Sequence, residues 1–157
     1  MAPRLHGRVH QLGGLLVTAA RISTPPQSAP KGWRISLWVS QLLLAAMYIP
    51  SGLMKLTKPL AELSQQMAWT ADLPQLVRIA GAADLAAGLG LILPALTRIA
   101  PHLTVWAAIG ATVLQVFAMV LHASRGEFGV LPINAILIAL QLFVIWGRTK
   151  KAPITPR

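Results

Sequence analysis

Four long apolar runs constrain this chain more than any other feature of its sequence. They cover residues 35–56, 76–96, 103–122 and 130–147. Each has about the twenty residues that a helix needs to cross the hydrocarbon core of a bilayer, at about 1.5 Å per residue. A backbone in lipid must satisfy its own hydrogen bonds, and a helix does so within one segment. The sequence therefore predicts an all-α fold, an integral membrane four-helix bundle.

The composition excludes several classes of function. Of the 157 residues, 55% are hydrophobic and 11% are charged, outside the usual range of soluble domains. The chain has no cysteine, so it offers no disulfide, thiolate metal site or thiol redox centre. Its four histidines are scattered, and neither a Ser-His-Asp arrangement nor a glycine-rich phosphate loop is apparent. We expect no metal site and no catalytic residue, and we do not expect the chain to be an enzyme on its own.

The charge distribution predicts the orientation of the bundle. The net charge of +10 comes from 14 Lys and Arg against 4 Asp and Glu. We do not expect nucleic-acid binding, because the bases lie between apolar runs and form no dense patch. Four spans place both termini on one side, and most bases fall there, which predicts cytoplasmic termini. The bases on the terminal side are Arg4, Arg8, Arg21, Lys31, Arg34, Arg98, Arg148, Lys150, Lys151 and Arg157; those on the opposite side are Lys55, Lys58, Arg78 and Arg125.

Three segments flank or interrupt the membrane domain, which we assign to residues 35–148. Residues 1–34 are basic and acid-free, which predicts a disordered arm on anionic lipid, with a targeting segment as the alternative. Residues 149–157 form a basic tail. Residues 57–74 are too short and mixed to cross, so we expect an amphipathic lid at the outer interface, with Met67 and Trp69 dipping into lipid.

Polar residues recur every seven positions within the spans, which places each set on one helix face. The sets are Gln41, Tyr48 and Lys55 in the first span, Gln115 and His122 in the third, and Asn134 and Gln141 in the fourth. Asp84 in the second span has only small neighbours three and four positions away, so we expect it at a close helix interface. Arg78 falls on the opposite face, where we expect it to snorkel to the interface without pairing with Asp84.

If these faces point inward, the outer half of the bundle encloses a polar pocket for a small molecule. Its expected lining is Tyr48, Lys55, Asp84, Gln115, His122 and Asn134, with Arg125 and Glu127 at the rim. Structural alternatives stay open for several of these residues. The glutamines can serve only as interhelical hydrogen-bond partners, and Asp84 can form a salt bridge with Lys55. His122 can contact solvent or lipid headgroups in place of relaying a proton.

Several motifs resemble those of the DoxX-like family of small four-helix integral membrane proteins. They are SGLMKL at residues 51–56, ADLAAGLG at 83–90 with LPALTR at 93–98, and His122 followed by RGE at 125–127 and PIN at 132–134. The resemblance covers residues 35–148, although many relatives carry Glu where this chain has Asp84. It implies a membrane bundle, and some relatives are named as subunits of quinone-linked redox systems.

We therefore expect a small accessory or quinone-interacting subunit of a membrane redox system, in the bacterial inner (plasma) membrane and with redox partner subunits. The pocket would bind a quinone headgroup through Tyr48, Gln115 or His122, while Asp84 exchanges protons. One alternative is a proton or small-solute transporter that uses Asp84 as its titrating group. Another is a membrane scaffold without catalytic activity. The oligomeric state stays open, because the small-residue face can pack within one chain or between two.

Overall fold

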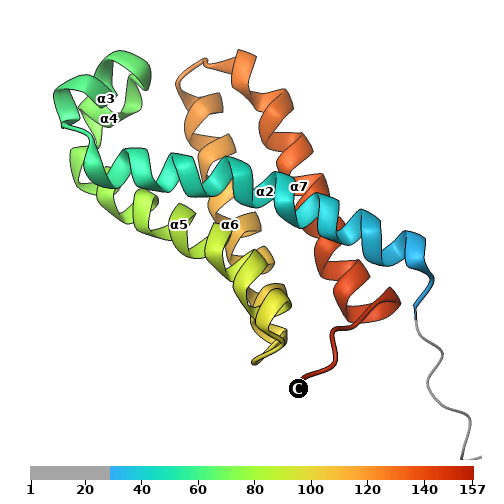
Figure 1. The fold of residues 1–157 in the computed structure, drawn as a ribbon. Helices are drawn as coiled ribbons and strands as arrows, with labels where there is room; N and C mark the ends of the chain where they lie inside the picture. The colour runs from blue at the N-terminus through green and yellow to red at the C-terminus, as the bar shows by residue number, and fades with distance from the viewer. Residues whose placement is uncertain (1–28) are drawn as a thin grey trace, which may run out of the picture.

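The computed structural model describes residues 29–157, which form a bundle of four long helices (Figure 1). All four are long and apolar enough to cross a membrane, the last together with its flanking turns. Within the described residues there is no strand, which confirms the predicted all-α fold. The long helices are α2 (Lys31–Thr57), α5 (Pro74–Thr97), α6 (His102–Ser124) and α7 (Leu131–Trp146).

Helices α2, α5 and α6 extend beyond the predicted spans, and α7 does so only together with its flanking turns. Helix α2 begins at Lys31, so residues 31–34, which we assigned to the arm, are helical. Residues 1–28, which make up most of that arm, lie outside the described residues. After α7, a π-turn η2 (Gly147–Lys151) takes in three residues of the predicted tail. Hydropathy underestimates these ends because basic side chains can continue a helix while their charges reach the interface.

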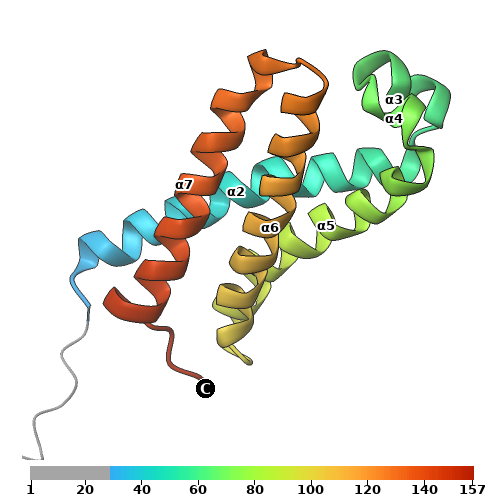
Figure 2. The same ribbon diagram turned by 180° about the vertical axis from the view of Figure 1, so that it is seen from behind.

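The helices pack in a closed order around the bundle, and Figure 2 shows this arrangement from behind. Helix α2 packs on α5, α5 on α6, α6 on α7, and α7 returns to α2. The α2–α5 contact is so close that a Cβ on Gly52 would lie 2.6 Å from the backbone nitrogen of Leu85 and 2.8 Å from the carbonyl oxygen of Gly81. This confirms the predicted close interface on the small-residue face of the second span.

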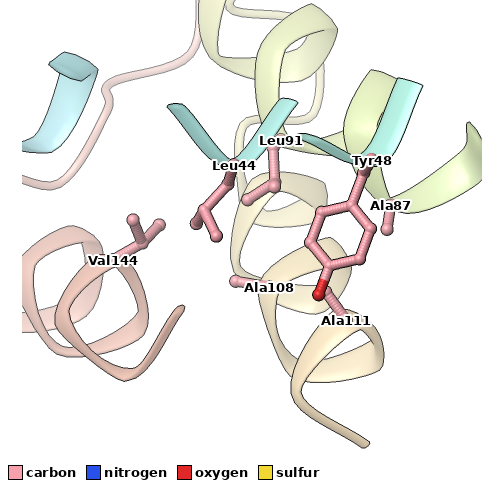
Figure 3. Packing of buried hydrophobic residues seen from close by; sticks show 7 residues of the cluster. All are labelled: Leu44, Tyr48, Ala87, Leu91, Ala108, Ala111 and Val144. Carbon is pink, nitrogen blue, oxygen red and sulfur yellow. The ribbon is translucent and has the colours of Figure 1, made fainter. Parts of the chain in front are cut away.

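The interior is narrow and the outer surface is apolar. One core cluster joins all four helices (Figure 3): Leu44, Tyr48, Ala87, Leu91, Ala108, Ala111 and Val144. Large apolar side chains such as Phe117, which is 70% exposed, lie on the outer faces of the helices. A soluble domain rarely exposes so continuous an apolar surface. The distribution fits a bundle surrounded by lipid.

Two short helices, α3 (Leu60–Gln66) and α4 (Trp69–Asp72), form the segment that we call the lid. It lies beside the junction of α2 and α5, at the bundle end that we call the lid end (Figure 1). The opposite end of the bundle, where α2 begins and α7 ends, is called the terminal end. The expectation that Trp69 dips into lipid is wrong, because Trp69 is 7% exposed and packs with Leu63 and Val77. Two short helices that fold onto α5 need a large side chain to fill the space beneath them.

Candidate functional site

A buried ion pair joins the first two spans. The Nζ of Lys55 lies 2.6 Å from Oδ2 of Asp84, and the two side chains are 13% and 7% exposed. The Ser51 hydroxyl donates to the same Oδ2 at 2.8 Å, and Lys55 also donates to the Ser51 oxygen. Ser51 and Lys55 are four residues apart, so one face of α2 presents both to Asp84. The salt bridge expected as the structural alternative for Asp84 is present.

A second polar layer lies toward the middle of the bundle. The Tyr48 hydroxyl donates to Oε1 of Gln115 at 2.9 Å and accepts from Nε2 of Gln141 at 2.5 Å. Figure 3 shows the Tyr48 ring among the core side chains, with its hydroxyl near Ala111. Two buried polar atoms on α7, Oε1 of Gln141 and Nδ2 of Asn134, have no hydrogen-bond partner among the described residues. The inward stripe of α7 therefore retains unused hydrogen-bonding capacity.

A third layer, near the terminal end, contains a residue that sequence reasoning missed. Arg148 is 6% exposed, and its Nε and Nη2 donate to Oε1 of Gln41 at 2.8 and 2.5 Å. The Nε2 of Gln41 donates to the carbonyl oxygen of Leu91. We placed Arg148 at the end of the domain among the bases that set the topology. Its spacing was a signal, because Arg148 follows Gln141 by seven residues, as Gln41 precedes Tyr48.

The three layers thus follow the predicted seven-residue stripes, at intervals of about 10 Å along the helices. The structure does not join all the predicted pocket residues into one cluster. Lys55 and Asp84 form the outer layer, and Tyr48 and Gln115 belong to the middle layer. Asn134 lies buried on α7 and joins neither layer through a side-chain hydrogen bond of its Nδ2.

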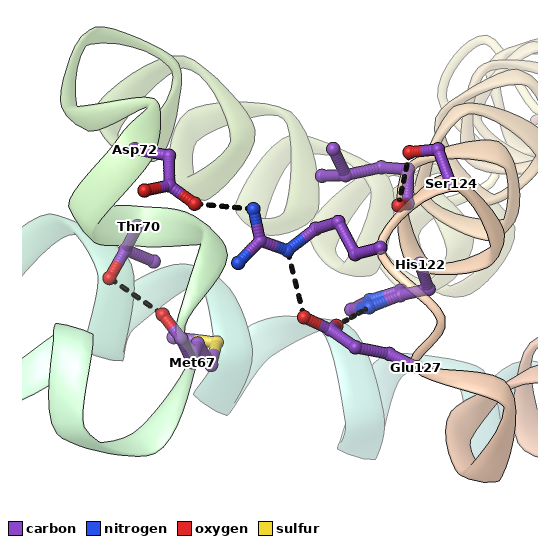
Figure 4. A network of polar contacts seen from close by, with 8 residues as sticks. Met67, Thr70, Asp72, His122, Ser124 and Glu127 are labelled. Carbon is purple, nitrogen blue, oxygen red and sulfur yellow. Dashed lines mark hydrogen bonds and ion pairs between the residues drawn. The ribbon is translucent and has the colours of Figure 1, made fainter.

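The other three candidates, His122, Arg125 and Glu127, form a separate network at the lid end (Figure 4). Arg125 pairs with Asp72 of the lid, and its Nε lies 2.8 Å from Oε1 of Glu127. The other oxygen of Glu127 lies 2.5 Å from Nδ1 of His122. Gly126 has a φ of +73°, a conformation that favours glycine and turns the chain so that Glu127 faces back toward α6. His122 therefore contacts Glu127 and connects the end of α6 to the lid through Arg125.

The charges of this network hold Glu127 ionised. The hydrogen bond from Arg125, and after it that from His122, lowers the pKa of Glu127 from its ordinary value of 4.5. Glu127 and then Asp72 raise the already high pKa of Arg125. A carboxylate with a depressed folded-state pKa stabilises the folded form above its unfolded pKa, and the contribution is lost as pH falls through the folded value. The ion pairs of Arg125 with Asp72 and Glu127, which connect the lid to the bundle, are therefore formed at neutral pH.

Acidification from about pH 6 to a pH below the lowered pKa of Glu127 should loosen the lid, because protonated Glu127 no longer holds Arg125 in place against Asp72. Since the chain has no cysteine, Ala71→Cys and Ser124→Cys create a unique pair of sites for spin labels. We expect their distance distribution to broaden at low pH. Glu127→Gln should broaden it already at pH 6 and weaken the pH response. Identical distributions at both pH values and in Glu127→Gln would contradict this function of the network.

Arg78 differs in part from its prediction. As predicted, Arg78 forms no ion pair with Asp84. Its guanidinium donates to the carbonyl oxygens of Lys55 and Lys58 at 2.5 and 3.1 Å. Arg78 thus satisfies free carbonyls at the C-terminus of α2, which an interfacial arginine on α5 can reach because the two helices pack so closely.

Comparison with known proteins gives one match. The model of the DoxX-like family matches residues 39–144, which hold the ion pair and the middle layer but end before Arg148. No curated protein and no solved structure matches the chain significantly.

Proposed function

Because the chain belongs to the DoxX-like family, we propose that this membrane protein is a small accessory subunit that binds a quinone headgroup for a membrane redox system. The observation that carries the proposal is the buried pair of Lys55 and Asp84. A charged side chain within a span costs about 2.5–3.5 kcal/mol on insertion scales, and such residues commonly mark functional sites. A purely apolar contact between α2 and α5 would avoid this cost.

Two polar groups on α7 that are unpaired among the described residues suit a quinone. A quinone carbonyl accepts hydrogen bonds, and a quinol hydroxyl also donates them. Asn134 offers an unpaired donor in Nδ2, and Gln141 offers an unpaired acceptor in Oε1. Both side chains are buried on the inward stripe of α7.

A bound quinone would supply a carrier that takes up two electrons and two protons. The residues of this chain would hold the headgroup and manage protons near it. Asp84 is the carboxylate that would exchange a proton, while Lys55 and Ser51 orient its Oδ2. The electrons would come from a partner redox subunit, since this cysteine-free chain has no thiol redox centre of its own.

The proposed location is the plasma membrane, in bacteria the inner membrane, with cytoplasmic termini. Its support is the excess of bases on the terminal side. In that orientation the ion pair lies in the outer half of the bundle, toward the lid.

Quantifying bound quinone tests the proposal. The protein is purified in mild detergent and its lipids are extracted for mass spectrometry. We expect stoichiometric quinone in wild type, a clear loss in Asp84→Asn and Asn134→Leu, and no loss in His122→Ala, whose side chain contacts Glu127. Wild-type protein with no quinone above the lipid background would overturn the proposal.

Transport of protons is the second candidate, favoured by the succession of three polar layers along the bundle. Such a series could pass a proton between Asp84 and the terminal end. Proton flux into protein-containing liposomes, lost in Asp84→Asn and found together with an absence of bound quinone, would replace the redox assignment by transport.

A further inference from the structure

The terminal end of the bundle has positive charge and no acidic side chain to balance it. The four acids of the chain are Glu62, Asp72, Asp84 and Glu127, and the structure places them in the lid, in the outer ion pair and in the α6–α7 loop. Residues 1–61 and 128–157 contain no Asp or Glu. No carboxylate side chain on the segments that flank α2 and α7 can therefore neutralise the bases there, which makes an external anion the complementary partner.

Among the bases of this end that the structure describes, Arg148 is the buried one. Its five N–H groups make two hydrogen bonds to Gln41 and a longer one, at 3.4 Å, to the carbonyl oxygen of Ala152. Two N–H groups thus have no partner among the described residues. The Trp38 ring lies 5.5 Å from the guanidinium carbon, which favours the cation without neutralising it. Arg148 is therefore a buried cation that is fixed by its hydrogen bonds to Gln41 and has two N–H groups free to bind a ligand.

A groove of about 430 Å³ adjoins Arg148. It lies between the start of α6 and the chain that follows η2. His102 and Thr149 are its other polar side chains, and the rest of its lining is apolar. The apolar lining consists of Pro101, Val105, Trp106, Ile109, Pro153, Ile154 and Pro156. Trp106 is 65% exposed on the outer surface of α6, so the groove continues onto the face that meets lipid.

We propose that this groove binds an anionic phospholipid, with the headgroup phosphate on Arg148 and an acyl chain along Val105, Trp106 and Ile109. A guanidinium matches the geometry of phosphate oxygens, and the free N–H groups of Arg148 supply the donors. The apolar lining selects a lipid over a free anion, which would leave Val105 and Ile109 without a partner. The site is independent of the quinone proposal, because it lies at the other end of the bundle.

The test measures lipid binding to delipidated protein in detergent by native mass spectrometry. Phosphatidylglycerol and phosphatidylcholine with the same acyl chains are titrated separately. We expect tighter binding of phosphatidylglycerol to wild type. Arg148→Gln should lose about tenfold in affinity, which corresponds to about 1.4 kcal/mol, because it removes the charge-assisted hydrogen bonds to the phosphate. Lys150→Gln removes an exposed base of the same end and should change the affinity less than about twofold.

A second variant keeps the test decisive if Arg148→Gln does not fold. Val105→Trp fills the groove without removing a charge. It should weaken the binding of phosphatidylglycerol as Arg148→Gln does. Soluble glycerol phosphate should not compete. Equal binding of the two lipids, an equal loss in Lys150→Gln, full lipid binding in Val105→Trp, or competition by glycerol phosphate at lipid-like concentrations would each overturn the proposed site.

Discussion

Lys55→Met should destabilise the bundle by about 3–5 kcal/mol, because it leaves the carboxylate of Asp84 buried without its cation. In the wild-type structure Asp84 is held by Lys55 at 2.6 Å and by Ser51 at 2.8 Å. The hydroxyl alone cannot balance a charge within the spans. Unfolding in mixed micelles with rising dodecyl sulfate, followed by circular dichroism, measures the loss.

Two variants control this result. Lys58→Met removes a lysine three residues away whose partner, Glu62, is 46% exposed, so it should cost less than about 1 kcal/mol. The double variant Lys55→Met/Asp84→Leu removes both charges and should recover most of the stability. A cost for Lys55→Met no greater than that for Lys58→Met would show that the buried pair does not stabilise the fold.

Gly52→Ala should destabilise the same contact by about 1–3 kcal/mol through overpacking. The new Cβ would lie 2.6 Å from the Leu85 nitrogen and 2.8 Å from the Gly81 oxygen. Both atoms belong to the backbone of α5, so no side chain can rotate away and the two helices must separate. The separation also lengthens the distance between Lys55 and Asp84. The same micelle titration measures this variant.

Gly110→Ala is the matched control, because a Cβ there meets no atom within 4 Å. Its effect should be neutral or stabilising by up to about 1 kcal/mol, since alanine favours a helix over glycine. If Gly52→Ala were as stable as Gly110→Ala, the close approach of α2 and α5 would not be required by the fold.

Much of the fold could be predicted because lipid imposes simple rules on sequence. Apolar length locates the four spans, and small residues around Asp84 indicate a close helix contact. Seven-residue spacing also predicts which faces turn inward. The ion pair between Asp84 and Lys55 could also be predicted from the sequence, because both residues lie on inward faces at similar depths.

The parts that could not be predicted depend on tertiary contacts that spacing does not encode. Arg148 follows an apolar run, and its position predicts one of the basic residues that set the membrane orientation. In the structure its long side chain turns back to Gln41. His122 meets Glu127 only because the chain reverses at Gly126, with its positive φ. Trp69 is buried because the lid packs on α5, whereas an isolated amphipathic segment would place it in lipid.

The most direct test of the central claim is whether Asp84 changes its protonation when a bound quinone is reduced. Redox-difference infrared spectroscopy of the reconstituted protein measures this through the carboxyl carbonyl band. We predict a band that appears or shifts on reduction, moves in deuterium oxide and is absent in Asp84→Asn. A quinone that is reduced without any carboxyl signal, or with a signal unchanged in Asp84→Asn, would contradict the proton-exchanging function of the buried pair.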